Sequence, residues 1–337
     1  MDSSTEDYVL DKECYISTEY STALTDYLCQ CEKKLQDKEL NEQLPLDFLF
    51  LDCRRDTLKN GEVIFLTSKS NSPRIDFAET CIYNIANRFL EKAEKENDKQ
   101  CILYFNFEDS INDICNRFFS KRKNVSWKEI NLGVFNKLAT FVRESSGLPI
   151  YFNDCQGKIP TIDFIYKTMH TLNNKEKIGF VVIENLDSLT FENDDYYLIM
   201  KKIKRLAKCF NIPILVLNQF KGNIKDTYLE CVESLWELER NFCADKVIFI
   251  YSLAIPYTTR PIQFQSELDK DFQKRLDIWE KKYWENENLY KIIVAQQRYN
   301  IRGDGPTIKI VSYDYRTGNF SLPSEDTKET PNDDIPF

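Results

Sequence analysis

The sequence lacks the features of a secreted, membrane or zinc-binding protein. It has one histidine, His170, and none of its 11 cysteines forms a CxxC pair, so we expect no zinc site but buried free thiols in a reducing compartment. No apolar run approaches the roughly 20 residues that span a bilayer. The first residues, "MDSSTEDYVLDKE", are acidic where a signal peptide is basic and then apolar. The sequence therefore predicts a cytoplasmic protein that does not contact membranes.

Positive charge is also in deficit. A formal net charge of −9 argues against coating nucleic acid by bulk electrostatics, so nucleic-acid binding has to be inferred from individual sites. Apolar residues are plentiful, since 42% of the chain is hydrophobic and 13% aromatic. This composition is ample for the packed core of one large domain or two ordinary ones.

Short apolar runs alternate with helical patterns from residue 47 onward. The runs span residues 62–66, 101–107, 149–154, 179–186, 212–219, 245–253 and 289–297. They are apolar at successive positions, which is typical of strands buried on both faces. Helical spacing lies between most of them, as in the series Phe77, Cys81, Ile85 and Phe89. The pattern predicts an α/β fold with a mainly parallel sheet flanked by helices.

Three segments stand outside this pattern. Residues 21–43 predict a linker helix within an N-terminal segment, 1–45, that either packs on its own domain or docks on a neighbouring subunit. Residues 266–286 predict an inserted amphipathic helix that either packs within the chain or binds a partner; its apolar stripe comprises Leu268, Phe272, Leu276, Trp279 and Tyr283. Residues 323–337 are acidic and rich in proline, which predicts a disordered tail.

Polar residues close several of the predicted strands. In an open parallel sheet, ligands bind beyond the carboxyl ends of the strands, and the residues there are Glu108, Glu184, Gln219 and the pair Gln297 and Arg298. One carboxylate can hold magnesium and another can orient the water that attacks a nucleoside triphosphate. Each residue alone fits an ordinary strand end, but together they favour a nucleotide site.

Residues 46–322 resemble the RecA-type motor domain of the DnaB-like replicative DNA helicases, a P-loop NTPase fold. The matching phrases are "NGEVIFLTSKSNSPRIDFA", "CILYFNFEDS", "IGFVVIENLDSL", "RLAKCFNIPILVLNQF", "ESLWELERNFCADKVIFIYS" and "IIVAQQRYNIRG". These phrases occur in the same order as in the family, and together they extend over most of the chain. The resemblance implies ATP and magnesium as ligands, a ring of subunits, and DNA as a partner.

The resemblance also implies roles for single residues. Glu108 takes the place of the catalytic carboxylate, and Gln219 that of the phosphate sensor. Glu184 stands where the family has an aspartate for the metal. Arg298 matches an arginine finger offered to the adjacent subunit, whereas Gln296 stands where the family has a lysine.

The candidates for contact with DNA phosphates are Lys221 and Lys225. The alternative is that these two residues are ordinary loop lysines exposed to solvent.

The phosphate loop departs from the family pattern of Gly, Lys and Ser or Thr, because Ser72 is followed by Pro73, Arg74 and Ile75. The whole stretch "LTSKSNSPRIDFAET" contains no glycine. Proline has no N–H for a phosphate, isoleucine has no oxygen for a metal, and an arginine fork does not replace a buried ammonium. Triphosphate hydrolysis depends on positioning and electrostatics. The loop therefore predicts a degenerate Walker A motif and a pseudoenzyme.

The last five residues resemble the acidic tip of bacterial single-stranded DNA-binding proteins; they are Asp333, Asp334, Ile335, Pro336 and Phe337. The resemblance implies replication or repair proteins that recognise such a tip, by an apolar pocket for the aromatic ring and basic residues for the carboxylates. The alternative is a charged disordered end.

Three functions follow from these observations. The first, which the phosphate loop favours, is a non-catalytic accessory or regulatory protein in DNA replication or repair. The second is an active, ATP-dependent hexameric helicase, favoured by Glu108, Gln219 and Arg298. The third is a subunit that caps or inserts into a genuine helicase ring through residues 21–43.

Overall fold

The computed structural model describes eight stretches of the chain: residues 59–69, 72–132, 135–153, 160–189, 196–219, 243–254, 260–297 and 307–323. The predicted helix at 21–43 and the acidic tail beyond residue 323 lie outside these residues. So do three of the predicted site residues, Lys221, Lys225 and Arg298.

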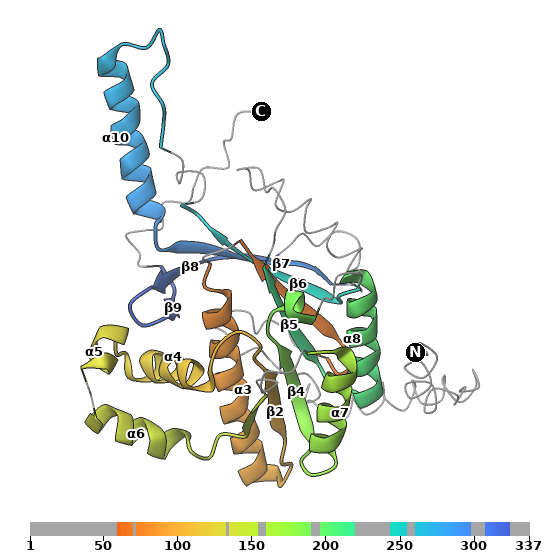
Figure 1. The fold of residues 1–337 in the computed structure, drawn as a ribbon. Helices are drawn as coiled ribbons and strands as arrows, with labels where there is room; N and C mark the ends of the chain where they lie inside the picture. Colours follow the sequence, from red (N-terminus) through yellow and green to blue (C-terminus); the bar gives the residue numbers. More distant parts are fainter. Residues whose placement is uncertain are drawn as a thin grey trace, which may run out of the picture.

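A single nine-stranded sheet organises the described residues, in the order β3-β2-β4-β5-β1-β6-β7-β8-β9 (Figure 1). The strands are β1 Val63–Ser68, β2 Cys101–Phe105, β3 Ile150–Asn153, β4 Ile178–Ile183, β5 Ile214–Gln219, β6 Lys246–Ser252, β7 Leu289–Gln297, β8 Thr307–Asp314 and β9 Asn319–Ser321. The first six are parallel to one another, and β7, β8 and β9 are antiparallel. The predicted α/β class with a mainly parallel sheet is confirmed.

Helices cover both faces of the parallel part of the sheet. The helices of the described residues are α3 Arg74–Glu96, α4 Ile111–Lys123, α5 Trp127–Asn131, α6 Phe135–Ser145, α7 Ile162–Asn173, η2 Leu186–Leu189, α8 Tyr196–Phe210 and α10 Asp269–Asn286. Side chains of α3 and α4 pack on one face, and those of α7 and α8 on the other. Every residue of β1 and β2 is buried, which explains why these strands are apolar at successive positions.

Of the three antiparallel strands, only β7 was predicted as a strand. In β8, Val311 and Tyr313 are buried whereas Ile308 is exposed, so this strand alternates between a core face and a solvent face. Such a strand does not give a continuous apolar run. Gly318, at φ +76°, forms the turn from β8 to β9, where a side chain would be strained.

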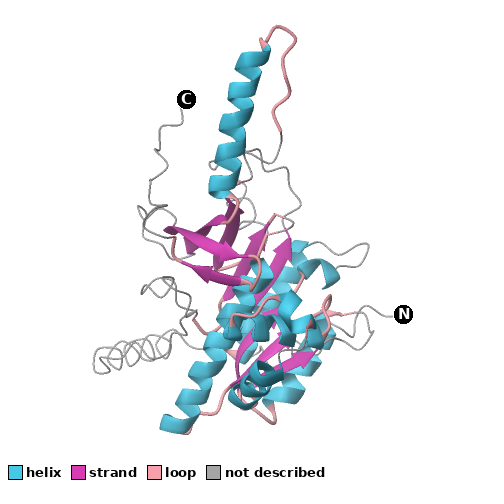
Figure 2. Ribbon diagram, turned by 90° about the vertical axis from the view of Figure 1, so that its left-hand side faces the viewer, coloured by secondary structure: helices cyan, strands magenta, loops and turns pink. Residues whose placement is uncertain are grey.

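Helix α10 connects β6 to β7, as the stripe at 266–286 predicts, but it points away from the sheet (Figures 1 and 2). Only Leu276 of the helix is buried, and Leu268 at its N-cap is exposed. The segment before the helix partly covers the stripe. Arg275 of α10 lies over the rings of Phe264 and Phe272 and forms an ion pair with Glu267, and both Phe264 and Glu267 belong to that segment. The helix therefore forms an arm with this segment and is not a layer of the core.

None of the described helices is long and apolar enough to cross a bilayer. Among the described cysteines, Cys81 and Cys101 are buried free thiols, as predicted, whereas Cys115 and Cys209 are exposed. The latter two lie on the outer sides of α4 and α8, so their burial was predicted wrongly.

Candidate functional site

The predicted site residues meet at the carboxyl edge of the parallel strands. Arg74 begins α3 just after β1, Glu108 follows β2, and Glu184 follows β4. Strands β2 and β4 are neighbours, with Phe105 opposite Ile183. Gln219 ends β5 opposite Ser68, the last residue of β1. The structure thus brings four positions from different parts of the chain to one sheet edge, as the strand-end pattern predicts.

Glu184 is a buried carboxylate with an unpaired oxygen. Its side chain is fully buried, and its Oε2 accepts a hydrogen bond of 2.9 Å from the hydroxyl of Tyr104. Its Oε1 has no hydrogen-bond partner within the described part of the chain. Burial raises the pKa of Glu184 to about 7, because the charged form loses its solvation. A cation bound to the unpaired oxygen would stabilise the charged form of such a carboxylate.

Glu108 is held by the loop that follows Glu184. Asn185 donates to Glu108 Oε1 through its side-chain amide. Asn185 itself adopts a left-handed conformation, with φ 58°, and its Oδ1 accepts from the backbone N–H of Asp187 at 3.0 Å. The sequence "IENLDSL" therefore contributes a further candidate site residue, Asn185, which was not predicted. Its position directly after Glu184 was the available signal.

Arg74 is buried near the same edge of the sheet. Only 7% of the residue is exposed, and its Nε has no hydrogen-bond partner among the described residues. Burial lowers the pKa of the guanidinium, and the carboxylates of Glu108, Glu184 and Asp187 oppose this shift. Arg74 and Glu184 are thus both buried, whereas Glu108 is exposed and Asp187 is half-buried.

The first turn of α3 is a poor phosphate cradle. Pro73 is the N-cap, with φ −78°, and no side chain caps the helix. The backbone N–H of Arg74 is already bonded to the carbonyl oxygen of Ser72 at 2.8 Å. Ile75 packs against the core with an apolar side chain. The charge of the Arg74 side chain interacts with Glu108 and Glu184 at this edge, so Arg74 is the candidate for a phosphate contact.

One turn further along α3, a second buried charged cluster has quite different bonding. Glu79 is fully buried, and its two oxygens bind Arg117 Nε at 2.7 Å and Lys121 Nζ at 2.5 Å. Lys121 also binds Asp76 at 2.8 Å, and Arg117 also binds Asp109 at 2.9 Å. These five residues are called the α3–α4 ion network below. Through Asp109 it anchors the residue next to Glu108 to helix α3.

The end of β7 lies at the opposite edge of the sheet. Gln297 pairs with Lys246, the first residue of β6, whereas the site lies at the level of the other end of the parallel strands. The chain therefore enters the segment of Arg298 from the edge remote from Arg74.

Magnesium and ATP fit the site in part. Besides Glu184 Oε1, the side-chain oxygen of Asn106 is buried without a partner among the described residues, and hard oxygen donors of this kind suit magnesium. Against this, Pro73 has no N–H for a phosphate, and Ile75 has no hydroxyl for the metal. Among the described residues, no group of three or more histidine, cysteine or acidic side chains is arranged to hold a metal ion.

Comparison with known proteins identifies the family and agrees with the fold. The DnaB-like helicase C terminal domain family matches residues 44–303. A probable replicative DNA helicase from Trieres chinensis is 24% identical over 196 residues, which is 54% of this chain. The matched part is 41% of that relative, so the chain spans about two fifths of its length.

Two solved structures share the fold. An ATPase domain of known structure superposes with a TM-score of 0.65 at 16% identity, over 89% of this chain and 99% of that one. A DnaB-like replicative helicase, solved for its interactions with primase, superposes with a TM-score of 0.64 at 17% identity, over 88% and 68%. The family match covers well over half of the chain. This protein therefore belongs to the DnaB-like helicase C-terminal domain family.

Proposed function

We propose that this chain is a non-catalytic accessory or regulatory member of the DnaB-like replicative helicase family, with a role in DNA replication or repair. The family normally binds ATP and magnesium. The observation that carries the proposal is the first turn of α3, where Pro73 caps the helix and Ile75 packs against the core. Hydrolysis depends on several positioned groups at once, so losing two of them removes most of the rate.

A nucleotide can still bind weakly through the remaining groups of this site. Arg74 supplies a cation for a phosphate, and Glu184 and Asn106 supply buried oxygens for magnesium. Magnesium, when bound, would neutralise phosphate charge, and Arg74 would orient the phosphate next to it. The loss of one transition-state cation, with Gln296 in place of the family's lysine, also favours binding without turnover.

The test is phosphate release from Mg·ATP by the purified full chain, with and without single-stranded DNA. We expect a rate no higher than that of Glu108→Gln, because the cradle does not position the γ-phosphate. A wild-type rate that disappears in Glu108→Gln would contradict the proposal.

The second candidate is a working hexameric motor. The unpaired buried atoms of Glu184 and Asn106 favour it, because buried polar groups normally have partners and a bound ligand would supply them. Arg298, which matches the family's arginine finger, also favours it. This function predicts rings that form only with nucleotide and then separate DNA strands. Native mass spectrometry and a strand-separation assay test it, and no binding at millimolar nucleotide excludes it.

A further inference from the structure

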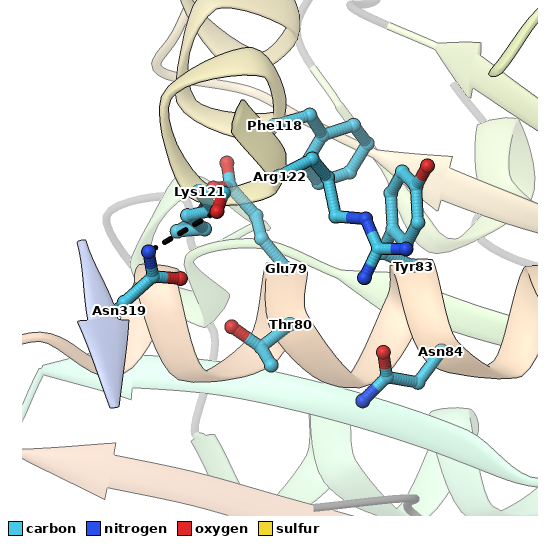
Figure 3. Close-up of a pocket in the computed structure, with 8 residues that line it drawn as sticks. All are labelled: Glu79, Thr80, Tyr83, Asn84, Phe118, Lys121, Arg122 and Asn319. Atoms are coloured by element: carbon cyan, nitrogen blue, oxygen red, sulfur yellow. Dashed lines mark hydrogen bonds and ion pairs between the residues drawn. The ribbon is translucent and has the colours of Figure 1, made fainter. Parts of the chain in front are cut away.

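A small pocket lies between α3, α4 and β9, away from the candidate nucleotide site (Figure 3). Its volume is about 80 Å³, and the residues that line it are Glu79, Thr80, Tyr83, Asn84, Phe118, Lys121, Arg122 and Asn319. Tyr83 and Phe118 form an aromatic wall, with ring centroids 5.7 Å apart. The pocket thus joins hydrogen-bonding side chains, an aromatic surface and two cations.

Arg122 differs from the other cations near this pocket. Lys121 is bound to Asp76 and Glu79, and Lys123 is bound to Glu144 at 2.5 Å. Arg122 is exposed, and its guanidinium lies 4.3 Å from the centroid of the Tyr83 ring. No carboxylate of the described residues is within ion-pair distance of Arg122, although the charge of Arg122 acts on Glu144 at longer range. A guanidinium next to an aromatic ring keeps N–H groups that can bind a carboxylate.

The chain itself supplies a matching segment. Residues 324–334 contain five acidic residues and one basic residue, Lys328. They follow directly on β9, whose residue Asn319 lines the pocket. Glu325 is six residues beyond Asn319, so an extended chain places it within roughly 20 Å of the pocket wall. A tether this short gives an effective concentration on the order of millimolar.

We propose that the acidic segment 324–334 folds back onto this pocket and that its carboxylates bind Arg122. The occupant is the chain's own segment, because it begins five residues beyond Asn319 of the pocket wall and carries the opposite charge. Glu79 does not repel it, since Arg117 and Lys121 already neutralise that carboxylate. The folded-back segment would not be free for another protein, so a partner of the tail has to compete with the pocket. This proposal does not depend on whether nucleotide binds.

The first test uses a labelled peptide of residues 324–334 and fluorescence anisotropy. The peptide should bind a chain truncated after Pro323, and bind the full chain about tenfold or more weakly because its own segment competes. Arg122→Ala in the truncated chain should lower the affinity about tenfold, as expected for the loss of a charge-assisted hydrogen bond. Lys128→Ala, which removes an exposed cation outside the pocket, should leave the affinity unchanged.

The second test keeps the full chain and needs no truncation. A lysine-specific protease cuts after Lys328, the one basic residue of the segment, and Arg122→Ala should raise this cleavage rate several-fold at low salt. Equal cleavage in wild type and Arg122→Ala overturns the proposal. So does a peptide affinity that is the same for the truncated and full chains, because the pocket would then take an acidic segment from another molecule.

Discussion

Two buried charged clusters lie along one helix, α3, and they are bonded in opposite ways. In the α3–α4 ion network, both oxygens of Glu79 are bound to cations. In the site at the start of the helix, Arg74 Nε and Glu184 Oε1 are buried and have no partner among the described residues. A complete network fixes how elements pack, whereas buried groups without partners are costly unless a ligand completes them. The difference separates a structural cluster from a candidate binding site.

The largest expected effect on stability comes from a change in the α3–α4 ion network. Glu79→Leu should lower the free energy of unfolding by about 3–5 kcal/mol, because Arg117 and Lys121 lose their shared buried carboxylate and keep only Asp109 and Asp76 as partners. Urea denaturation measures the loss. Glu91→Leu is the control, since Glu91 is an exposed carboxylate on the same helix, and its effect should be small. Equal effects of the two changes would show that the network does not stabilise the packing of α3 on α4.

The second prediction concerns the pH dependence of stability. Burial raises the pKa of Glu184 to about 7, above its ordinary value of 4.5, so the folded state holds this proton more tightly than the unfolded state. The Glu184 contribution to the free energy of unfolding should therefore fall as pH rises from about 4.5 to about 7, by about 3 kcal/mol.

Denaturation of wild type and Glu184→Gln across this range isolates that contribution, because glutamine does not titrate. The difference between the two proteins should change with pH in favour of the variant at high pH. A constant difference would mean that Glu184 titrates near 4.5 and that the cluster already neutralises it.

Arg74 should matter for binding more than for stability. Arg74→Met should weaken Mg·nucleotide binding about tenfold, which corresponds to the loss of one charged contact to a phosphate. The free energy of unfolding should change by less than about 1 kcal/mol. The buried guanidinium has an Nε without a partner among the described residues, so removing it also removes the cost of burying that group. Calorimetry and denaturation measure the two quantities. Lys95→Met, at an exposed site of the same helix, should change neither.

The smallest effect is expected for Tyr104→Phe. The hydroxyl of Tyr104 donates to Glu184 and so favours its charged form. Its removal should lower the free energy of unfolding by about 1 kcal/mol and move the midpoint of the Glu184 titration to higher pH. A titration of the Glu184 carboxyl by NMR measures the shift, and a midpoint that moves to lower pH would contradict the assigned hydrogen bond.

The sequence predicts the parallel part of the fold and the edge that carries the site. Buried strands leave continuous apolar runs, and the polar residue after each run marks where the strand ends, which located Glu108 and Glu184. It did not predict the α3–α4 ion network. Glu79 and Arg117 are 38 positions apart, and their pairing depends on how two helices pack, which leaves no local pattern.

Strand β8, and the fact that α10 points away from the sheet, were not predicted for related reasons. Val311 and Tyr313 give a period of two instead of an apolar run. An amphipathic stripe indicates that a helix has an apolar face, but not what covers that face.

The most direct test of the proposed function is isothermal calorimetry of the full chain with Mg·ATP. We predict a weak binding heat that returns to baseline after each injection, and that Arg74→Ala diminishes. A sustained heat of hydrolysis that is abolished by Glu108→Gln would contradict the account, because it would show that the rewritten first turn of α3 still positions a triphosphate for attack.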